Sequence, residues 1–343
     1  DRPTTQAWNM RYGGSGTDNL TSTIKTRDGG YLSGGYTNSG LSGDKTQTSQ
    51  GKNDYWIVKS DQNGKNEWDK RYGGSGEDYL NRVIQTKDGG YLLAGSSFSG
   101  KSGDKSEASR GNRDFWVIKV DPQGNKEWDK TYGGSGNDEL LKVIQLSSGE
   151  YVLAGTSNSP VSGDKTQASQ GGSDYWLVKI DQTGSKLWDQ RYGGSLAEEL
   201  GSFIETSEGG FLLGGSSDSN AGGDKKENSR GYSDFWVVKT NAQGTVEWNK
   251  TFGGDDTDQA YSIGQAPGGT YFMAGWSFSG KSGDKTQASQ GESDYWVVAV
   301  DQEGNQVLDQ RYGGNGKEEL RTVTPTRDGG LLLAGRSASG VSG

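Results

Sequence analysis

The stretch "DFWVIKVDPQGNKEWDKTYGG" (Asp114–Gly134) decides the fold of this chain. Its opening segment carries apolar side chains at four consecutive positions, Phe115–Ile118. Successive side chains of a strand point to opposite faces, so this strand is predicted to be buried on both faces. Such a strand lies in a sheet that is packed between other sheets. "PQGN" then predicts a turn, and "KEWDKTYGG" a second strand that returns antiparallel.

The stretch recurs at a fixed period along the chain. Tryptophan is found every sixty residues, at Trp8, Trp68, Trp128, Trp188 and Trp248, and Leu308 takes the sixth position. An aromatic residue followed by Gly-Gly recurs in the same register, at Tyr12, Tyr72, Tyr132, Tyr192, Phe252 and Tyr312. A fixed period of this length indicates one supersecondary module that stacks on its neighbours.

Two further strands complete the module. "LNRVIQT" (Leu80–Thr86) runs into "KDGG", and "YLLAGSS" (Tyr91–Ser97) follows. Asp-Gly-Gly supplies the positive φ of a tight hairpin, so each module has four antiparallel strands. Four-stranded sheets packed face to face predict an all-β chain, a β-propeller with six blades. A β-helix is the alternative, but its coils are much shorter, and seven or eight blades are expected if the chain continues.

The repeat predicts a single domain over residues 1–343. It begins with a lone fourth strand at 8–12, continues with complete blades at 18–72, 78–132, 138–192, 198–252 and 258–312, and ends with a partial blade at 318–343. We expect the strand at 8–12 to join the last blade. The given sequence stops within the loop that precedes the third strand of the sixth blade. Three alternatives follow: this blade has three strands, more chain follows, or a strand from a partner fills the gap.

Composition excludes several functional classes. The chain has no cysteine and no histidine, which excludes disulfides, thiolate chemistry, histidine-ligated zinc and histidine triads. Its net charge is -9 with acids and bases interspersed, which argues against a nucleic-acid partner. No run of 18 apolar residues is present, so no membrane insertion is expected. The 11 Trp, 16 Tyr and 8 Phe predict a thin, aromatic-rich core.

A polar loop between the second and third strands repeats an Asp-Lys pair. The candidate ligand-binding residues are Asp44, Lys45, Asp104, Lys105, Asp164, Lys165, Asp224, Lys225, Asp284 and Lys285. In one interpretation these residues anchor the loop, because Asp side chains bond nearby backbone N–H groups and each Lys reaches an acid on the next loop. In the other they line a sugar-binding pocket in every blade.

An acid precedes the first strand of every repeat, at Asp18, Asp78, Asp138, Glu198, Asp258 and Glu318. If that strand is innermost, these carboxylates ring one mouth of a central channel, and a cation would offset their repulsion. "GGDDTD" (Gly253–Asp258) adds Asp255 and Asp256, which makes it the best candidate for Ca²⁺, an ion that prefers oxygen ligands. In the alternative each acid caps a turn or pairs with a local base, and no cofactor is expected.

The stretches "VDPQGNKEWDKTYGG" and "VIQTKDGGYLLAG" resemble the repeats of secreted and cell-surface β-propellers of Bacteroidetes and of some archaeal surface proteins. Proteins with such repeats often resemble type IX secretion cargo. The D-x-x-G-x-x-x-W spacing (Asp121, Gly124, Trp128) is similar to the tryptophan-docking motif of quinoprotein propellers, in which the Trp wedges between blades. This chain lacks the cysteine pair and histidine of their active site. The resemblance implies a secreted, extracellular protein at the cell surface.

We expect a non-catalytic binding or adhesion module that presents repeated loops on one face. Its partner would be a glycan or a cell-surface protein, and repetition favours multivalent binding. A structural subunit of a larger cell-surface or secretion-linked assembly is the alternative. A carboxylate-based glycoside hydrolase is a third, but catalysis needs unique acids in one or two blades and no blade stands out. The chain is therefore not expected to be an enzyme.

Overall fold

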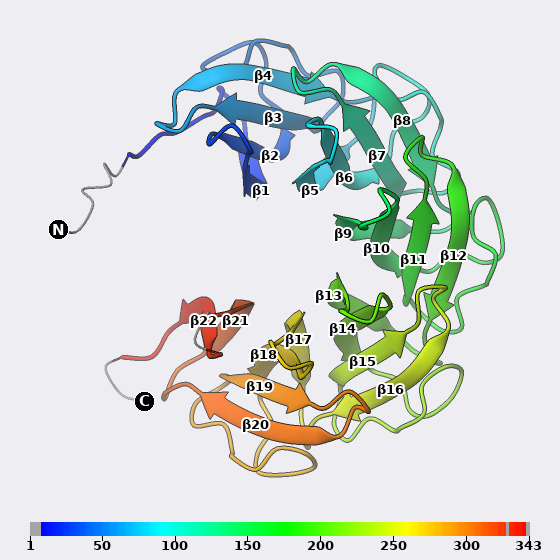
Figure 1. Ribbon diagram of the computed structural model, residues 1–343, viewed down its shortest axis with the longest axis vertical. Coiled ribbons are helices and arrows are strands. Elements are labelled where there is room, and N and C mark those ends of the chain that lie inside the picture. Colours follow the sequence, from blue (N-terminus) through cyan, green and yellow to red (C-terminus); the bar gives the residue numbers. More distant parts are fainter. Residues whose placement is uncertain (1–7, 327–328, 341–343) are drawn as a thin grey trace. The chain divides into compact units, whose positions relative to one another are not determined.

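The computed structural model describes residues 8–326 and 329–340, in which every helix or strand element is a β-strand (Figure 1). The strands of the first three sheets are β1 (Asp18–Lys25), β2 (Tyr31–Thr37), β3 (Asp54–Ser60), β4 (Asn66–Tyr72), β5 (Asp78–Gln85), β6 (Tyr91–Ser97), β7 (Asp114–Val120), β8 (Lys126–Tyr132), β9 (Asp138–Gln145), β10 (Tyr151–Ser157), β11 (Asp174–Ile180) and β12 (Lys186–Tyr192). The others are β13 (Glu198–Glu205), β14 (Phe211–Ser217), β15 (Asp234–Thr240), β16 (Val246–Phe252), β17 (Asp258–Gln265), β18 (Tyr271–Ser277), β19 (Asp294–Val300), β20 (Gln306–Tyr312), β21 (Glu318–Pro325) and β22 (Leu331–Ser337).

Each sheet is one sixty-residue repeat. Neighbouring strands in the sheets are neighbours in sequence, so β1 to β4 form one sheet and β5 to β8 the next, and β21 pairs with β22 alone. The five complete sheets begin and end at the predicted bounds, 18–72 through 258–312. The prediction of an all-β chain made of repeated four-stranded antiparallel sheets is confirmed. Residues 341–343 of the predicted partial blade lie outside the described residues.

Glycine sets the turns where the sequence predicts them. Gly89 in the first hairpin of the second sheet has φ 94°, and Gly124 in the last hairpin has φ 77°. An L-residue with a side chain rarely adopts such angles. Asp121 fixes the second turn because its Oδ1 accepts hydrogen bonds from the backbone N–H of Gln123 at 2.9 Å and of Asn125 at 2.8 Å.

A β-bulge interrupts the first strand of the sheet. In β5 the register with β6 shifts between Leu80 and Arg82, so Asn81 is the extra residue. Leu80 and Val83 are fully buried, whereas Arg82 is exposed. The bulge therefore directs Arg82 away from the core.

The chain divides into two compact units. Asp1–Leu153, Ser159–Thr166 and Val178–Asp189 form the first, and Ala154–Asn158, Gln167–Leu177 and Gln190–Gly343 the second. Within the first unit β5 contacts β1, β2 and β3, and within the second β17 contacts β13, β14 and β15. Each sheet thus packs its first strand onto the preceding sheet of its unit. The third strand is buried at every position of β7, as its apolar side chains predict.

The fourth strand of one sheet docks on the next through its tryptophan. The ring of Trp68 lies 6.4 Å from the ring of Tyr91. A Cβ atom on Gly124 would come within 3.0 Å of the Trp68 ring, so the glycine of the turn gives the indole its place. The hydroxyl of Tyr72 donates to the carbonyl oxygen of Gly124. This is the contact between sheets that the docking motif implies.

Residues 8–12 differ from the prediction because they form no strand. Trp8 still docks as Trp68 does, with its ring 5.5 Å from that of Tyr31 and its Nε1 donating to the carbonyl of Gln62 at 3.1 Å. A strand also needs a hydrogen-bonded neighbour, and no strand within the described residues pairs with 8–12. Within the described residues the sixth sheet consists of β21 and β22 only.

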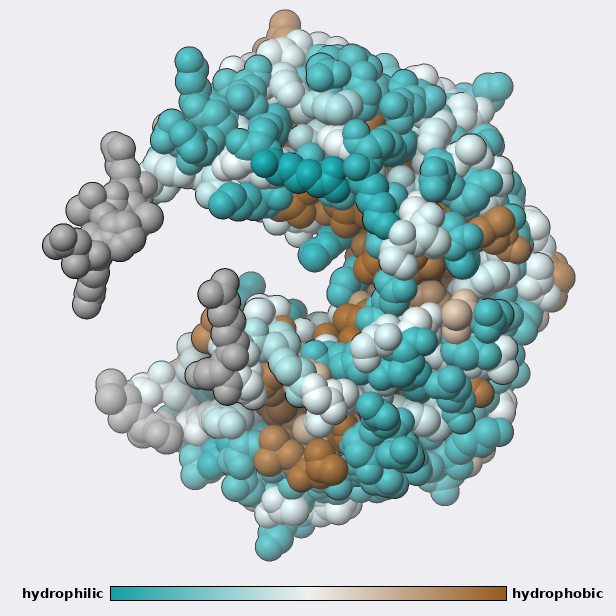
Figure 2. Space-filling model, viewed as in Figure 1, coloured by the Kyte–Doolittle hydropathy of each residue, from teal (hydrophilic) through white to brown (hydrophobic). Residues whose placement is uncertain are grey.

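Hydrophilic side chains dominate the surface seen in Figure 2. The polar loops account for this, because the apolar residues of the strands are largely buried. Within the described residues, no helix has the length and apolar character needed to cross a membrane.

Candidate functional site

The lysines of the Asp-Lys pairs are interior residues. Lys45, Lys105, Lys165, Lys225 and Lys285 are each 2% exposed. Lys225 Nζ donates to Ser217 Oγ at 3.0 Å, to the Ser219 carbonyl at 2.6 Å and to Ser229 Oγ at 2.8 Å. Burial lowers the pKa of Lys225 to about 8. The ammonium group therefore holds its own loop against the end of the strand.

The aspartates of the pairs bind the loop to the connection that precedes their own sheet. Asp104 Oδ2 accepts from the backbone N–H of Gly73 at 3.1 Å and from Arg71 Nη1 at 2.6 Å. Asp224 repeats this with Gly193 at 3.1 Å and Arg191 at 2.7 Å. Asp44, Asp164 and Asp284 accept from the equivalent glycines. The structure thus brings each pair together as a loop anchor.

Replacing a buried loop lysine is expected to destabilise the protein. Lys225→Met keeps the length of the side chain but removes three hydrogen bonds, at an expected cost of about 1–3 kcal/mol in the free energy of unfolding. Urea denaturation would measure the change. Lys226→Met is the matched control, because Lys226 is exposed and should shift the midpoint little. Equal effects of the two substitutions would contradict the anchoring role.

The acids predicted to precede the first strands are the first residues of those strands, and hydrogen-bond donors surround them. Asp78 has no exposed surface. Its carboxylate accepts from the backbone N–H of Gly74 at 2.7 Å, from Ser99 Oγ at 3.0 Å and from Ser97 Oγ. Asp18, Asp138, Glu198, Asp258 and Glu318 likewise accept from the glycine N–H four residues earlier. These carboxylates accept hydrogen bonds within their own turns, which is the contact that the turn-capping interpretation predicts.

The acidic loop before β17 follows the same pattern. Asp255 Oδ1 accepts from Ser282 Oγ at 2.8 Å and from the backbone N–H of Gly280 at 3.0 Å. Asp256 Oδ1 lies 2.7 Å from the backbone N–H of Thr257. Over the described part of the chain, no three carboxylates gather as metal ligands would.

A second buried acid, Asp114, lies beside the turn that Asp138 holds. Asp114 begins β7, where its Oδ2 accepts from the backbone N–H of Arg110 at 2.6 Å and its Oδ1 has no hydrogen-bond partner within the described residues. The backbone N–H of Asp138 donates to the carbonyl of Arg113 at 2.6 Å, which places Asp138 nearby. Burial, with the nearby Asp138 carboxylate as a further cause, raises the pKa of Asp114 to about 6. Close carboxyls of this kind favour retention of a proton.

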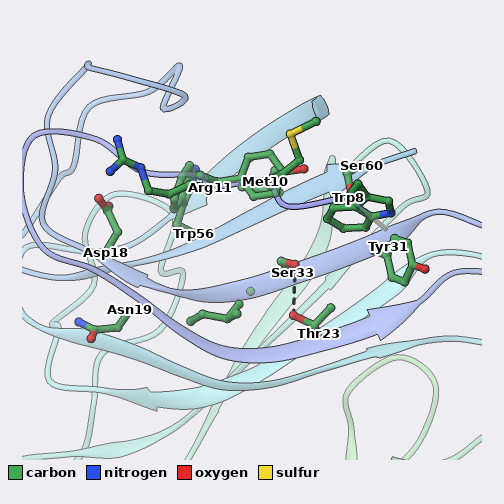
Figure 3. A pocket seen from close by; sticks show the side chains of 14 residues that line it. Trp8, Met10, Arg11, Asp18, Asn19, Thr23, Tyr31, Ser33, Trp56 and Ser60 are labelled. Atoms are coloured by element: carbon green, nitrogen blue, oxygen red, sulfur yellow. Dashed lines mark hydrogen bonds between the residues drawn. The ribbon is translucent and has the colours of Figure 1, made fainter. Parts of the chain in front are cut away.

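The first sheet has a cavity of about 510 Å³ beneath residues 8–12 (Figure 3). Thr23 and Ser33 meet there at 3.2 Å between their hydroxyl oxygens, as Figure 3 shows. The equivalent residues of the second sheet are Val83 and Leu93, which are buried against the first sheet. The hydroxyl side chains of Thr23 and Ser33 suit the face of the first sheet, because this face is covered by the short segment 8–12 and water instead of by a preceding sheet. We therefore assign this cavity to the architecture of the repeat.

A different cavity, of about 440 Å³, breaks the repeat. It lies in the first unit and is lined by Tyr36, Glu77, Tyr79, Asn81, Phe98, Arg113 and Glu139. The ring of Tyr36 stands edge-on to that of Tyr79, with centroids 4.8 Å apart, and Tyr79 is 6.3 Å from Phe98. Phe98 is 41% exposed. We call Tyr36, Tyr79 and Phe98 the aromatic cluster.

The strand ends position the cluster. Tyr36 lies near the end of β2, Tyr79 is the second residue of β5, and Phe98 directly follows β6. The backbone N–H of Phe98 donates to the carbonyl of Glu77 at 2.8 Å, which fixes the phenyl ring beside Tyr79. The Tyr79 hydroxyl donates to Glu77 Oε2 at 2.8 Å.

Arg113 supplies the charge of this cavity. Its guanidinium carbon is 5.7 Å from the centroid of Tyr79 and 5.5 Å from that of Phe98, distances at which cation–π attraction acts. Its Nη1 pairs with Glu139 at 2.8 Å. The Arg113 guanidinium thus already contacts two rings, and the Glu139 carboxylate neutralises its charge. Aromatic, amide and carboxylate groups form the rest of the cavity lining.

Sequence reasoning missed the aromatic cluster, although the signal is present in the repeat. At the position of Tyr36 the other copies carry Ser96, Thr156, Ser216, Trp276 and Arg336, and at the position of Phe98 they carry Asn38, Asn158, Asp218, Phe278 and Ala338. Aligning the copies therefore singles out a related group in the second unit. There the rings of Trp276 and Phe278 lie 5.3 Å apart, and Tyr261 stacks on Trp276 at 6.4 Å.

No model of a protein family matches this sequence, nor does any curated protein. Among solved structures the chain is similar to the Neurospora crassa Pan2 WD40 domain, with 11% identity, a TM-score of 0.42 and coverage of 94% of this chain and 90% of that chain. A glucose dehydrogenase has 12% identity, a TM-score of 0.45 and coverage of 92% of each chain. A Dyadobacter fermentans protein described as of unknown function has 12% identity, a TM-score of 0.45 and coverage of 89% and 96%. Functions do not transfer at such identities.

Proposed function

We propose that this protein is an extracellular, non-catalytic β-propeller that binds a neutral polyol, such as a glycan, through the aromatic cluster of Tyr36, Tyr79 and Phe98. The observation that carries the proposal is the cavity of about 440 Å³ in which these side chains replace the polar residues of most other repeats. Because most repeats fold without aromatic residues at these positions, the fold does not require them. Exposed aromatic residues with no structural necessity indicate a binding surface.

The chemistry of the cavity suits a sugar. Aromatic faces stack on the apolar C–H face of a sugar ring, while a few convergent polar groups accept and donate hydrogen bonds to its hydroxyls. Glu77, Asn81 and Glu139 supply carboxylate and amide groups at the rim. A cationic ligand suits the site less well, since the Arg113 guanidinium already lies against Tyr79 and Phe98.

The carboxylates of the cluster favour binding over catalysis. A glycosidase needs one carboxyl group that its environment keeps protonated. Glu139 is half exposed and paired with Arg113 at 2.8 Å, and Glu77 accepts the Tyr79 hydroxyl. Both carboxylates therefore already interact with a neighbouring side chain of the cavity, which suits groups that take part in binding.

The group around Trp276 in the second unit suggests a further site of the same kind. Arg321 lies 5.2 Å from the ring of Tyr261, which repeats the pairing of arginine with aromatic rings seen around Tyr79. Two weak sites on one chain would combine in avidity on a surface that carries many copies of the ligand.

A glycan array with the parent protein, followed by calorimetry with the best glycan, tests the proposal. Tyr79→Gln and Phe98→Asn introduce residues that other repeats carry at these positions, and each is expected to weaken binding at least tenfold by loss of stacking. Tyr232→Asn is the matched control, because Tyr232 is 77% exposed on a loop and the second repeat has Asn112 there. Undiminished binding by both cluster variants would refute the site, and turnover of aryl-glycosides by the parent would refute the non-catalytic role.

A further inference from the structure

Asn81 lines the cavity of the aromatic cluster and is the extra residue of the β-bulge in β5. Its Nδ2 donates to the carbonyl oxygen of Leu140 on β9. Because a carbonyl oxygen only accepts hydrogen bonds, this contact identifies which end of the amide is the nitrogen. The Oδ1 atom, which only accepts, is therefore the part of the amide that remains for a ligand.

The fold does not require an amide at this position. In the first repeat Thr21 takes the equivalent place, and its Oγ1 donates to the carbonyl oxygen of Leu80 at 2.8 Å. A hydroxyl group thus makes the same contact between neighbouring first strands. Asn81 adds an acceptor oxygen to that contact, and it does so in the repeat that contributes Tyr79 and Phe98 to the cavity.

The two carboxylates of the cavity are acceptors as well, since a carboxylate accepts hydrogen bonds and donates none. Glu77 Oε2 accepts from the Tyr79 hydroxyl at 2.8 Å, and its Oε1 lies 3.8 Å from Lys52 Nζ, beyond hydrogen-bond distance. Glu139 Oε2 pairs with Arg113 Nη1 at 2.8 Å, and half of its side chain is exposed. Within the described residues each carboxylate therefore commits one oxygen and keeps the other for a ligand.

Two donors of the lining, Tyr79 and Arg113, are engaged inside the protein. The Tyr79 hydroxyl donates to Glu77, and its oxygen lies 3.4 Å from Asn53 Nδ2. Arg113 Nη1 donates to Glu139, and the guanidinium lies against two aromatic rings. Acceptors thus predominate among the polar groups that remain for a ligand.

We propose, on the basis of the glycan-binding function proposed above, that this cavity selects a neutral sugar by adjacent free hydroxyl groups. It rejects sugars in which one of those hydroxyls is missing or capped, and sugars that carry a carboxylate. Hydroxyls on neighbouring carbons of a sugar ring donate to acceptors that lie close together, here Glu77, Asn81 and Glu139.

Both rejections follow from the chemistry of the lining. A site built to hydrogen-bond a hydroxyl group discriminates strongly against the analogue that lacks it, because a polar group of the site is then left unpaired. An anionic sugar would bring a third negative charge to a lining that holds two carboxylates and one guanidinium, Glu77, Glu139 and Arg113.

Calorimetry on the whole chain tests this selectivity. The probes are cellotriose, mannotriose and galactotriose, each as the free sugar, as forms with one hydroxyl replaced by hydrogen, and as the trisaccharide of the corresponding uronic acid. At least one free sugar is expected to bind, and its uronic form and one of its deoxy forms at least tenfold more weakly. If no free sugar binds, the proposed function fails together with this inference. If every deoxy form or the uronic form binds as tightly as the free sugar, this inference alone fails.

Two substitutions assign the selectivity to the named residues. Asn81→Thr keeps the contact that Thr21 makes but removes Oδ1, and it should weaken binding of the free sugar about fivefold, the effect of one hydrogen bond. Asn63→Thr is the matched control, because Asn63 is exposed on a turn where the third repeat has Thr183. Unchanged affinity of Asn81→Thr, or an equal loss in Asn63→Thr, would overturn the proposal.

Glu139→Gln provides a gain of binding, which a misfolded protein would not show. The fifth repeat carries an amide, Gln259, at the equivalent position. Removing the negative charge is expected to raise affinity for the uronic trisaccharide at least threefold, because the repulsion by the lining decreases. No gain for the uronic form would contradict the exclusion of anionic sugars by these carboxylates.

Discussion

Trp116→Ala is expected to lower the free energy of unfolding by about 3–5 kcal/mol, the usual cost of removing a large buried aromatic side chain. Trp116 is 0% exposed, and its ring lies 4.7 Å from that of Tyr55 in the preceding sheet. Its Nε1 also donates to Asp129 Oδ2 at 3.1 Å. The substitution therefore removes packing between two sheets and a hydrogen bond to a buried carboxylate.

The urea midpoint followed by circular dichroism would measure this effect. Trp68→Leu is the matched control, because the repeat itself carries Leu308 at the equivalent docking position. We expect it to cost less than Trp116→Ala, since Trp68 is only partly buried. A change below 1 kcal/mol for Trp116→Ala, on the order of a surface substitution, would show that the third strands do not form the core.

Stability is expected to increase as the pH is lowered from 7 to about 4.5. Burial raises the pKa of Asp114 to about 6, of Asp174 to about 7 and of Asp234 to about 6. Between 3.8, the ordinary pKa of an aspartate, and these values the folded state binds more protons than the unfolded state. The stabilisation from these carboxyls is therefore complete below pH 3.8 and lost as the pH rises through 6 to 7. A pKa that is raised by about two corresponds to at most about 3 kcal/mol of stabilisation per group.

Other carboxyl groups stop the increase in stability at low pH, because their pKa values are lowered in the folded state. Hydrogen bonding by Thr26 and Lys59 lowers the pKa of Asp28 to about 2, so its contribution is present above 3.8 and lost as the pH falls toward 2. A stability maximum near pH 4 to 5 follows from the opposing signs. Thermal melts between pH 3 and 8 would measure it, and Asp114→Asn should flatten the slope between pH 4.5 and 7. Stability that rises steadily from pH 4.5 to 7 in the parent would contradict the raised pKa values.

The repeat predicted the sheets because each of its signals is local. The glycine turn at Gly124 and the apolar run from Phe115 fix strand bounds within one module, and the structure reproduces these bounds. The strand at 8–12 could not be predicted in this way, since its hydrogen-bonded neighbour would have to come from a part of the chain distant in sequence. Trp8 kept its docking contacts but found no pairing partner within the described residues.

The candidate sites were harder to predict for a related reason. Pairs such as Asp104 and Lys105 were chosen as candidates because they recur in every repeat. A residue that recurs in every repeat serves a feature that all repeats share, and here that feature is the anchored loop. The aromatic cluster is visible only as a departure from the repeat. Whether Tyr79 and Phe98 lie in one cavity depends on how adjacent sheets pack, which spacing alone does not specify.

The hydrogen bond from the Tyr72 hydroxyl to the Gly124 carbonyl and the one from the Gly73 N–H to the Asp104 carboxylate both join one repeat only to the next. A gene that lost the sixty codons for residues 78–137 would join Glu77 to Asp138 and restore the same kinds of contact between the new neighbours. Unequal recombination could therefore lengthen or shorten such proteins by whole modules without any redesign of the interior.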